Sequence, residues 1–139
     1  MKRFHSTAVV LDNNGVLIIG ESGSGKSDLA LRLIDGGATL ISDDITICKK
    51  RTDEIYLSSP IETKGLLEVR EVGIITVPFV DGIRLKMVVR LIEKNSNRYP
   101  NKNFTRVLGV KIPLLVINGK SPSAVVKVKV KLNDIREKK

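Results

Sequence analysis

The sequence contains no tryptophan and few other aromatic residues, with two tyrosines and three phenylalanines among 139 residues. It is nevertheless basic, with a formal net charge of +9, and many of its lysines and arginines lie between residues 127 and 139. Proteins that bind nucleic acids commonly stack bases on aromatic rings, and no aromatic residue lies among these basic ones. We therefore expect no nucleic-acid partner. We interpret the basic segment as a solvated surface, with docking to an acidic partner or to nucleotide phosphates as the alternative.

Cysteine and long apolar runs are also scarce. Cys48 is the single cysteine, so the chain forms no internal disulfide, and no cysteine or histidine lies near it at metal-ligand spacing. We expect Cys48 to be a buried or half-buried small apolar residue. No apolar segment approaches the roughly 20 residues that a membrane helix needs, and the start of the sequence does not resemble a secretory signal. These features predict a cytoplasmic protein without a membrane partner.

Length and composition predict a single domain over residues 1–139. Hydrophobic residues make up 42% of the sequence and charged residues 28%, which is typical of a globular protein. The β-branched runs at 7–11 and 16–19 lie on either side of an Asn-Asn-Gly turn and predict a β-hairpin. The second run leads into the segment GESGSGKS, and a helical pattern with one apolar face follows it as far as Gly36. The order strand, glycine loop, helix indicates an α/β fold.

Strand-like patterns continue through the middle of the sequence. The run at 38–41 predicts a third strand that ends at two aspartates, and residues 45–57 predict a second hairpin around a charged turn. We interpret residues 66–77 as strand, on which Glu68 and Arg70, two positions apart, share a face.

The last third of the sequence is less regular. Residues 84–92 predict a long strand, 93–103 a polar loop, and 104–117 two short strands around Pro113. In the tail from residue 121, alternating valine and lysine suggest a strand. We favour a helix, because a Ser-Pro pair is a good helix start and four apolar side chains then share one helical face: Val125, Val128, Leu132 and Ile135.

Residues 20–27 match the phosphate-binding pattern G-x-x-x-x-G-K-[ST]. Glycines let the backbone fold around an anion and present its N–H donors, and the start of the following helix adds positive potential. The lysine reaches the outer phosphates, and the serine hydroxyl is a hard oxygen ligand for Mg²⁺. Because the motif lies between a strand and an amphipathic helix, we expect it to hold the phosphates of a nucleotide with magnesium. The expected binding residues are Gly20, Glu21, Ser22, Gly23, Ser24, Gly25, Lys26 and Ser27.

Two adjacent acids, Asp43 and Asp44, end the next predicted strand, where an open α/β sheet places its site residues. In nucleotide hydrolases one such aspartate holds magnesium, directly or through water. The second can accept a proton from an attacking hydroxyl, as a general base does. The alternative is an aspartate pair that caps a turn.

The residues alone leave four other positions open. A Glu68–Arg70 pair on one face is as consistent with a surface ion pair as with a site. His5, the only histidine, suits a structural role. Arg106 follows the polar loop and either stabilises charge during phosphoryl transfer or lies on the surface.

Taken together, these residues make the sequence resemble the catalytic domain of the HPr kinase/phosphorylase family, from His5 to about Pro113. A block LLEVR-x-x-GI, at this distance after a phosphate loop and an Asp-Asp pair, is distinctive, and ordinary P-loop ATPases and nucleotide kinases lack it. The chain looks like a short form of the family, without the N-terminal domain of longer members. The matching segments are the histidine at 5, GESGSGKS at 20–27, LISDD at 40–44, LLEVREVGII at 66–75 and FTR at 104–106.

The resemblance implies a P-loop-containing kinase domain of mixed α/β type, with a fold akin to that of phosphoenolpyruvate carboxykinase. Family members use ATP and Mg²⁺ to phosphorylate a serine on HPr, the small carrier protein of the sugar phosphotransferase system. Many members also reverse the reaction with inorganic phosphate and release pyrophosphate. They are typically hexamers, so the resemblance implies a homo-oligomer as well.

The resemblance also implies roles for individual residues. Lys26 and its loop would bind the phosphates, and Ser27 and Glu68 would be magnesium ligands, with Asp43 beside them near the metal. Asp44 would accept the proton of the serine hydroxyl in the forward direction and return it in reverse. Residues that match catalytic positions or the family's signature segment are His5, Arg106, Glu68, Arg70 and Gly73.

The sequence departs from the family pattern at two places. Glu71 stands where the family often has a glycine. Longer members carry a Pro-Val-x-x-Gly-Arg-Asn-like segment that is tied to phosphorolysis, and the corresponding region here, PLLVINGKSPSAV, contains no arginine. The second departure bears on the reverse reaction more than on the forward one. Two alternatives to an HPr kinase stay open: a P-loop kinase that acts on a small molecule, and a regulatory module that binds nucleotide without transferring phosphate.

Overall fold

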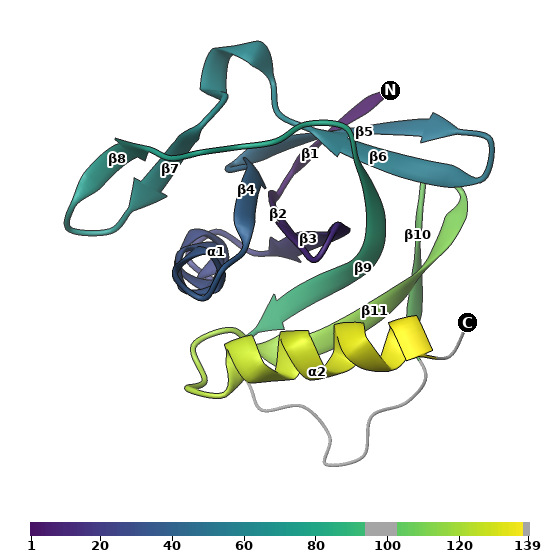
Figure 1. The fold of residues 1–139 in the computed structure, drawn as a ribbon. Helices are drawn as coiled ribbons and strands as arrows, with labels where there is room; N and C mark the ends of the chain where they lie inside the picture. Colours follow the sequence, from purple (N-terminus) through teal and green to yellow (C-terminus); the bar gives the residue numbers. More distant parts are fainter. Residues whose placement is uncertain (94–102, 138–139) are drawn as a thin grey trace.

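The computed structural model describes residues 1–93 and 103–137, so most of the predicted polar loop over 93–103 lies outside the described residues. Strands form a nine-stranded mixed sheet and a separate two-stranded sheet, β7–β8 (Figure 1). The strands are β1 (Lys2–His5), β2 (Thr7–Leu11), β3 (Asn14–Gly20), β4 (Thr39–Ser42), β5 (Ile45–Arg51), β6 (Glu54–Ser58), β7 (Leu66–Val69), β8 (Gly73–Thr76), β9 (Ile83–Ile92), β10 (Phe104–Val107) and β11 (Val110–Asn118). The helices are α1 (Lys26–Asp35) and α2 (Ala124–Glu137), with a 3₁₀ turn at Ile61–Thr63.

The path through the large sheet places β3 near its centre. The strand order is β1-β5-β6-β9-β3-β2-β4, and β11 pairs with both β9 and β10. β3, β9 and β11 are parallel to one another, so their carboxyl ends lie at the same edge of the sheet. The mixed sheet with helices confirms the α/β class expected from the sequence.

Two hydrophobic clusters fill the two faces of this sheet. Val16 and Ile18 of β3 pack with α1 and α2 on one face, whereas Leu17 between them packs on the other face with Ile55 and Leu57. This alternation follows from the two-residue period of a strand. The helices therefore cover one face, as Figure 1 shows for α1 and α2, and the β5–β6 hairpin folds over the other.

The predicted β2–β3 hairpin is present, with its turn one position earlier than expected. Leu11 pairs with Asn14, which leaves Asp12 and Asn13 as the two turn residues, at φ 49° and 66°. A two-residue turn of type I′, which matches the twist of antiparallel strands, needs positive φ at both positions, and Asp and Asn tolerate it. The turn holds β3 in register with β2 and so fixes where the glycine loop begins.

The tail is a helix, as favoured. Ala124, Val128 and Leu132 of α2 are buried against the sheet, and the partly buried Val125 and Ile135 pack beside them. Two of the valines that alternate with lysine along this segment, Val126 and Val130, point outwards, with exposed fractions of 60% and 62%. No helix among residues 1–93 and 103–137 is long and apolar enough to cross a membrane.

The interpretation of residues 66–77 as a continuous strand is wrong. The chain turns back at residues 70–72, and β7 and β8 pair with each other. Glu71 has φ 72°, a left-handed conformation that β-strands do not contain. Glu68 therefore lies on β7, whereas Arg70 lies in the turn, and the two do not share a strand face.

The expected break at Pro113 is also misplaced. β10 and β11 turn at Leu108 and Gly109, both with positive φ, and Pro113 lies inside β11. β11 pairs with β10 up to Pro113 and with β9 from Leu114 onwards. Proline is tolerated there because the strand changes partner at that residue and the missing N–H interrupts no continuous ladder.

Candidate active site

The glycine loop lies at the carboxyl edge of the three parallel strands. β3 ends at Gly20, which pairs with Leu91 near the end of β9, and α1 begins at Lys26. A Cβ atom at Gly20 would lie 2.5 Å from Ser24 Oγ and 3.2 Å from the backbone oxygen of Leu91, so a side chain at this position would force its neighbours to shift. Gly25 precedes α1 at φ 100°, a conformation that side chains rarely adopt.

Lys26 and Ser24 point to what the loop holds. The Lys26 ammonium donates hydrogen bonds to the carbonyls of Gly20 at 3.0 Å and Glu21 at 3.2 Å, and the residue is only 9% exposed. The Ser24 hydroxyl is buried and has no hydrogen-bond partner among the described residues. A buried cation whose bonds within the described part of the chain all go to its own loop, together with an unsatisfied hydroxyl, is expected of a loop shaped around an anion.

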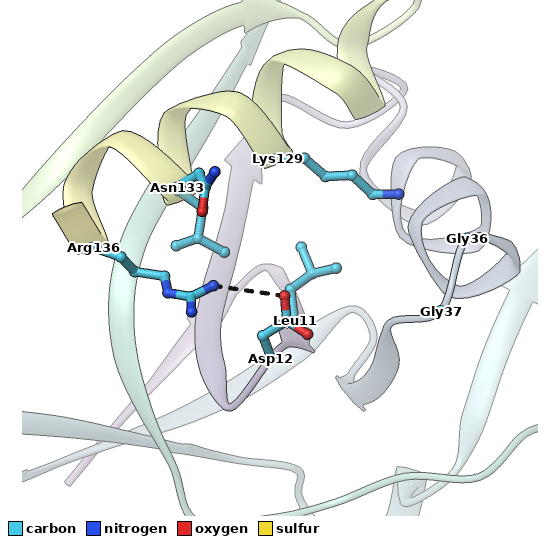
Figure 2. A pocket seen from close by; sticks show the side chains of 8 residues that line it. Leu11, Asp12, Gly36, Gly37, Lys129, Asn133 and Arg136 are labelled. Carbon is cyan, nitrogen blue, oxygen red and sulfur yellow. Dashed lines mark ion pairs between the residues drawn. The ribbon is translucent and has the colours of Figure 1, made fainter.

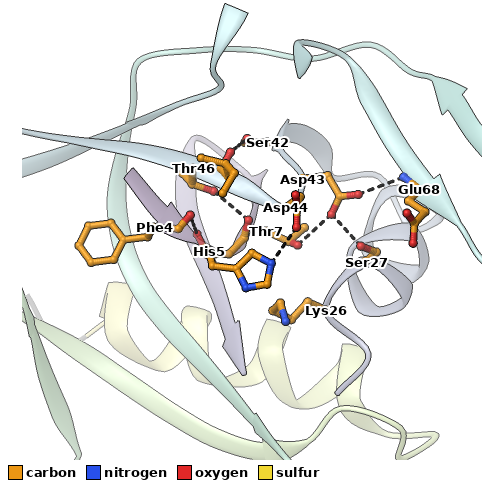
Figure 3. A network of polar contacts seen from close by, with 12 residues as sticks. Phe4, His5, Thr7, Lys26, Ser27, Ser42, Asp43, Asp44, Thr46 and Glu68 are labelled. Atoms are coloured by element: carbon orange, nitrogen blue, oxygen red, sulfur yellow. Dashed lines mark hydrogen bonds and ion pairs between the residues drawn. The ribbon is translucent and has the colours of Figure 1, made fainter. Parts of the chain in front are cut away.

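Asp43 is the centre of the polar network beside the loop (Figure 3). It is 6% exposed, and its Oδ1 accepts hydrogen bonds from the hydroxyls of Ser27 at 2.7 Å and Thr7 at 2.9 Å. Its Oδ2 accepts one from the backbone N–H of Glu68 at 3.0 Å. One carboxylate thus ties together α1, β2, β4 and β7, which come from distant parts of the sequence.

Asp44 has the opposite environment. Its side chain is 72% exposed, and its Oδ1 lies 2.8 Å from Nε2 of His5, whose side chain is 57% exposed. The backbone at Asp44 is left-handed, with φ 69°, and its carbonyl accepts a hydrogen bond from Ser6 N–H. This turn sends two consecutive carboxylates in different directions, one into the protein and one to the surface.

The oxygen donors around Asp43 suit a magnesium ion. The Ser27 hydroxyl and the Asp43 carboxylate are hard oxygen ligands, and Glu68, exposed beside them, adds a second carboxylate. Mg²⁺ is usually held by one or two protein carboxylates together with substrate phosphates and water, so it does not need a cage of acidic residues. Residues 1–93 and 103–137 accordingly contain no group of three or more His, Cys, Asp or Glu side chains arranged to hold a metal.

The structure does not bring the predicted Arg106 to the loop. Arg106 pairs with Lys111, and Leu114, three residues further along β11, is level with Val88 of β9. This register places Arg106 near the amino ends of the parallel strands, about six residues or roughly 20 Å from the edge where Gly20 lies. Its guanidinium donates to the Gly109 carbonyl at 3.0 Å, so its catalytic role stays a prediction from the resemblance.

Of the three residues predicted from the family's signature segment, the structure brings one to the Asp43 network. Glu68 joins the Asp43 network through its backbone N–H, whereas Arg70 is exposed in the β7–β8 turn, and Gly73 begins β8 at φ 113°.

Sequence reasoning missed Thr7, which donates to Asp43 and is fully buried. Its only signal is a hydroxyl at the start of an otherwise apolar strand, and Thr is common in strands for packing reasons.

A separate cavity of about 400 Å³ lies at the other end of α1 (Figure 2). It is lined by Gly36 and Gly37 after that helix, by the β2–β3 turn and by α2. An ion pair of 3.7 Å between Arg136 and Asp12 crosses it. None of the predicted site residues lines this cavity.

A model of one protein family, the HPr serine kinase C-terminal domain, matches residues 1–139. The chain belongs to this family. Among its relatives is the HPr kinase/phosphorylase of Prosthecochloris aestuarii, which is 33% identical over 143 residues, covering 91% of this chain and 42% of the relative. The enzyme of the same name from Clostridium acetobutylicum is 43% identical over 95 residues, covering 68% of this chain and 30% of the relative.

The fold of this HPr serine kinase C-terminal domain is also found in a solved structure. The Hpr(Ser) kinase/phosphatase from Coxiella burnetii matches with a TM-score of 0.86 and 25% identity, over 99% of this chain and 92% of the solved chain. The chain spans between 30% and 43% of the length of the curated relatives that it matches.

Proposed function

We propose that the chain transfers a phosphoryl group from Mg-ATP to a serine hydroxyl of an HPr-like phosphocarrier protein. The observation that carries this proposal is the environment of the two adjacent aspartates beside the glycine loop. Asp43 is buried and bonded to Ser27, as a residue near a metal is, and Asp44 is exposed next to His5, where an acceptor hydroxyl can approach. A module that only binds nucleotide needs the first carboxylate and not the second.

In this proposal the loop holds the donor and its metal. The amides of residues 20–27 and the Lys26 ammonium bind the phosphates, and Ser27, Asp43 and Glu68 hold Mg²⁺. The ion supplies neutralising charge to the phosphate oxygens when bound. Lys26 exchanges its bonds to the Gly20 and Glu21 carbonyls for bonds to phosphate oxygens, which are stronger because both partners are charged.

Asp44 is the general base. It accepts the proton of the acceptor serine while that oxygen forms a bond to the γ-phosphorus, and the bond from this phosphorus to the β,γ-bridging oxygen breaks to release ADP. His5, bonded to the Asp44 carboxylate, fixes its direction. In the reverse direction, an oxygen of inorganic phosphate attacks the phosphorus of the phosphoserine, and the bond from this phosphorus to the serine oxygen breaks. Asp44 returns the proton to that oxygen, and pyrophosphate is released.

The proposal includes a homo-oligomer, for which the resemblance to a family of hexamers is the support. Arg106 lies at the opposite edge of the sheet from the glycine loop of its own chain. It would take part in catalysis only if an oligomer brought it to the glycine loop of another copy. Sedimentation analysis of the purified chain tests the assembly independently of activity.

The test of the proposed reaction is intact-mass measurement of HPr after incubation with the chain and Mg-ATP. We expect one added phosphate on HPr, none on an HPr whose acceptor serine is alanine, and loss of transfer with Asp44→Asn. Asp53→Asn, in the exposed β5–β6 turn, is the matched control that removes one surface carboxylate and keeps transfer.

Two outcomes would overturn the proposed reaction. Transfer from ATP to a small molecule but not to HPr would identify a small-molecule kinase. Tight binding of Mg-ATP without transfer to either, and without an effect of Asp44→Asn, would identify a regulatory nucleotide-binding module.

A further inference from the structure

We propose that Lys120 is a second phosphate-contacting cation of the glycine loop and that Arg32 is the positioning residue that holds it there. The β11–α2 loop, residues 119–123, would thus form a second wall of the phosphate site. This inference rests on the proposed function, because it assigns another residue to the same donor site.

The sheet brings the β11–α2 loop to the glycine loop. β11 is parallel to β9 and β9 to β3, so the end of β11 at Asn118 lies at the same edge as Gly20. A Cβ atom built at Gly25 would lie 3.9 Å from the Lys120 Cγ, which places the stem of this lysine beside the last residue before α1. The position of Lys120 therefore follows from strand pairing and from this proximity.

Arg32 fastens the two loops together. It lies on α1, the helix that the glycine loop leads into, and its guanidinium donates hydrogen bonds to the carbonyls of Gly119 and Ser121. These are the residues immediately before and after Lys120. Asp28, one turn earlier on α1, accepts from Arg32 Nε at 3.1 Å and directs the guanidinium. A planar group with several fixed donors suits this double contact, which an ammonium cannot reproduce.

The backbone around Lys120 is held as well. The Asn118 side chain accepts a hydrogen bond from the Lys120 N–H at 3.0 Å, and Ser121 N–H closes the turn on the Asn118 carbonyl at 3.1 Å. Gly119 packs so closely on β9 that a Cβ atom there would lie 2.7 Å from a methyl group of Leu91. Lys120 is thus an exposed side chain on an immobilised backbone.

The charge of Lys120 is available for a ligand. Its side chain is exposed, and no acidic side chain within residues 1–93 and 103–137 forms an ion pair with it. Lysine carries a flexible ammonium that binds phosphate as a point charge. The ligand class is a phosphate group at the mouth of the loop, either the outer phosphates of a nucleotide or free phosphate and pyrophosphate.

The test compares ligands by isothermal titration calorimetry on the whole chain with Mg²⁺ present. We expect Lys120→Gln to weaken ATP and pyrophosphate about 10-fold, because a hydrogen bond to a charged group is lost, and to weaken AMP less than about two-fold. Lys50 is also an exposed lysine and lies on β5, so Lys50→Gln removes the same charge far from the loop and leaves all three affinities unchanged. Pyrophosphate separates a contact with phosphate from one with the nucleoside.

Arg32→Gln tests the positioning role. We expect it to weaken ATP about as much as Lys120→Gln does, and the double variant to bind no more than about two-fold more weakly than either one, because both changes remove the same contact. A merely structural effect of Arg32 would instead multiply with that of Lys120. Thermal unfolding without ligand confirms that each variant is folded.

The proposal is wrong if Lys120→Gln binds ATP as tightly as Lys50→Gln, or if ATP and AMP weaken equally. The binding data also separate this inference from the proposed reaction. Loss of ATP affinity in Lys120→Gln and Arg32→Gln but not in Lys50→Gln, in a chain that transfers nothing to HPr, would contradict the proposed reaction and leave the phosphate contact standing.

Discussion

Asp43 and Asp44 show how one backbone turn gives two identical side chains different tasks. The positive φ of Asp44 rotates its carboxylate away from that of Asp43, so one accepts three hydrogen bonds inside the protein and the other lies next to His5. The difference is a consequence of conformation and burial, and the sequence letters DD do not reveal which aspartate is which.

Replacing each aspartate by alanine will separate these environments. We expect Asp43→Ala to lower the free energy of unfolding by about 2–4 kcal/mol, because it leaves the hydroxyls of Thr7 and Ser27 and the Glu68 N–H without their acceptor. Asp44→Ala should change it by less than about 0.5 kcal/mol, because its carboxylate is exposed. Urea unfolding followed by circular dichroism measures both, and similar losses in the two variants would refute the assignment.

Cys48 is buried on β5, as expected, and burial raises the pKa of its thiol from 9.0 to about 12. Below pH 9 both states keep the thiol proton. Between about pH 9 and 12 the unfolded state loses it while the folded state keeps it, so the stability present below pH 9 is lost progressively across this window. We therefore expect unfolding free energy to fall with pH in this window more steeply for the unaltered chain than for Cys48→Ala, by up to about 1.4 kcal/mol per pH unit. Comparing the two chains cancels the titration of lysines and tyrosines, and parallel pH profiles would contradict the burial argument.

Among the elements, the β7–β8 hairpin carries a local conflict between sequence and conformation. Glu71 adopts φ 72° in its turn, which costs a residue with a side chain about 1–2 kcal/mol relative to a relaxed conformation. This is the position where the family often has glycine. In this chain Glu71 thus adopts the left-handed backbone conformation that glycine adopts more easily.

Glu71→Gly should consequently raise the free energy of unfolding, by about 0.5–1 kcal/mol after the entropy that glycine adds to the unfolded chain. Arg70→Gly is the matched control. Arg70 precedes Glu71 in the same turn and does not have positive φ, so glycine there brings only the entropic cost and should destabilise. Equal effects of the two substitutions in urea unfolding would show that the turn relaxes away from this conformation.

The elements that could be predicted are those specified by local sequence. The strand, glycine loop and helix at 16–35 follow from β-branched residues, glycines and an apolar helical face, and all three are present. Where the prediction failed, at residues 70–72 and at Pro113, the structure depends on which strand pairs with which. Pairing between distant segments leaves little trace in a single sequence, so Pro113 looked like a break although it lies inside β11.

The site was predictable in part for the same reason. Lys26, Ser27, Asp43 and Asp44 belong to short motifs with a stated chemistry, and the structure places them at one edge of the sheet. Thr7 and Lys120 come next to them only through the fold, because β2 pairs with β4 and β11 reaches the loop edge through β9. His5 is brought to Asp44 by pairing of β1 with β5.

At the scale of the whole molecule, ligand binding and folding are linked through the glycine loop. The loop connects the central strand β3 to α1, and Asp43 connects α1 to β2, β4 and β7, so a ligand that binds there stabilises elements on both sides of the site. A ligand that binds only the folded state raises the free energy of unfolding by about 2.7 kcal/mol at 100 times its Kd.

We expect Mg-ATP at that concentration to give this increase in the unaltered chain and in Asp44→Asn, because the proposed base touches the acceptor and not the donor. Lys26→Met, which removes the ammonium from the loop, should lose most of this increase in unfolding free energy. Chelating Mg²⁺ with EDTA should lower the increase in all three chains, because Ser27 and Asp43 are then no longer joined to the phosphates by the metal. Urea unfolding with and without nucleotide measures each value. If Asp44→Asn lost the stabilisation and Lys26→Met kept it, Asp44 would contact the donor and Lys26 would not. The proposed roles of the buried Asp43 near the metal and the exposed Asp44 as general base would then be wrong.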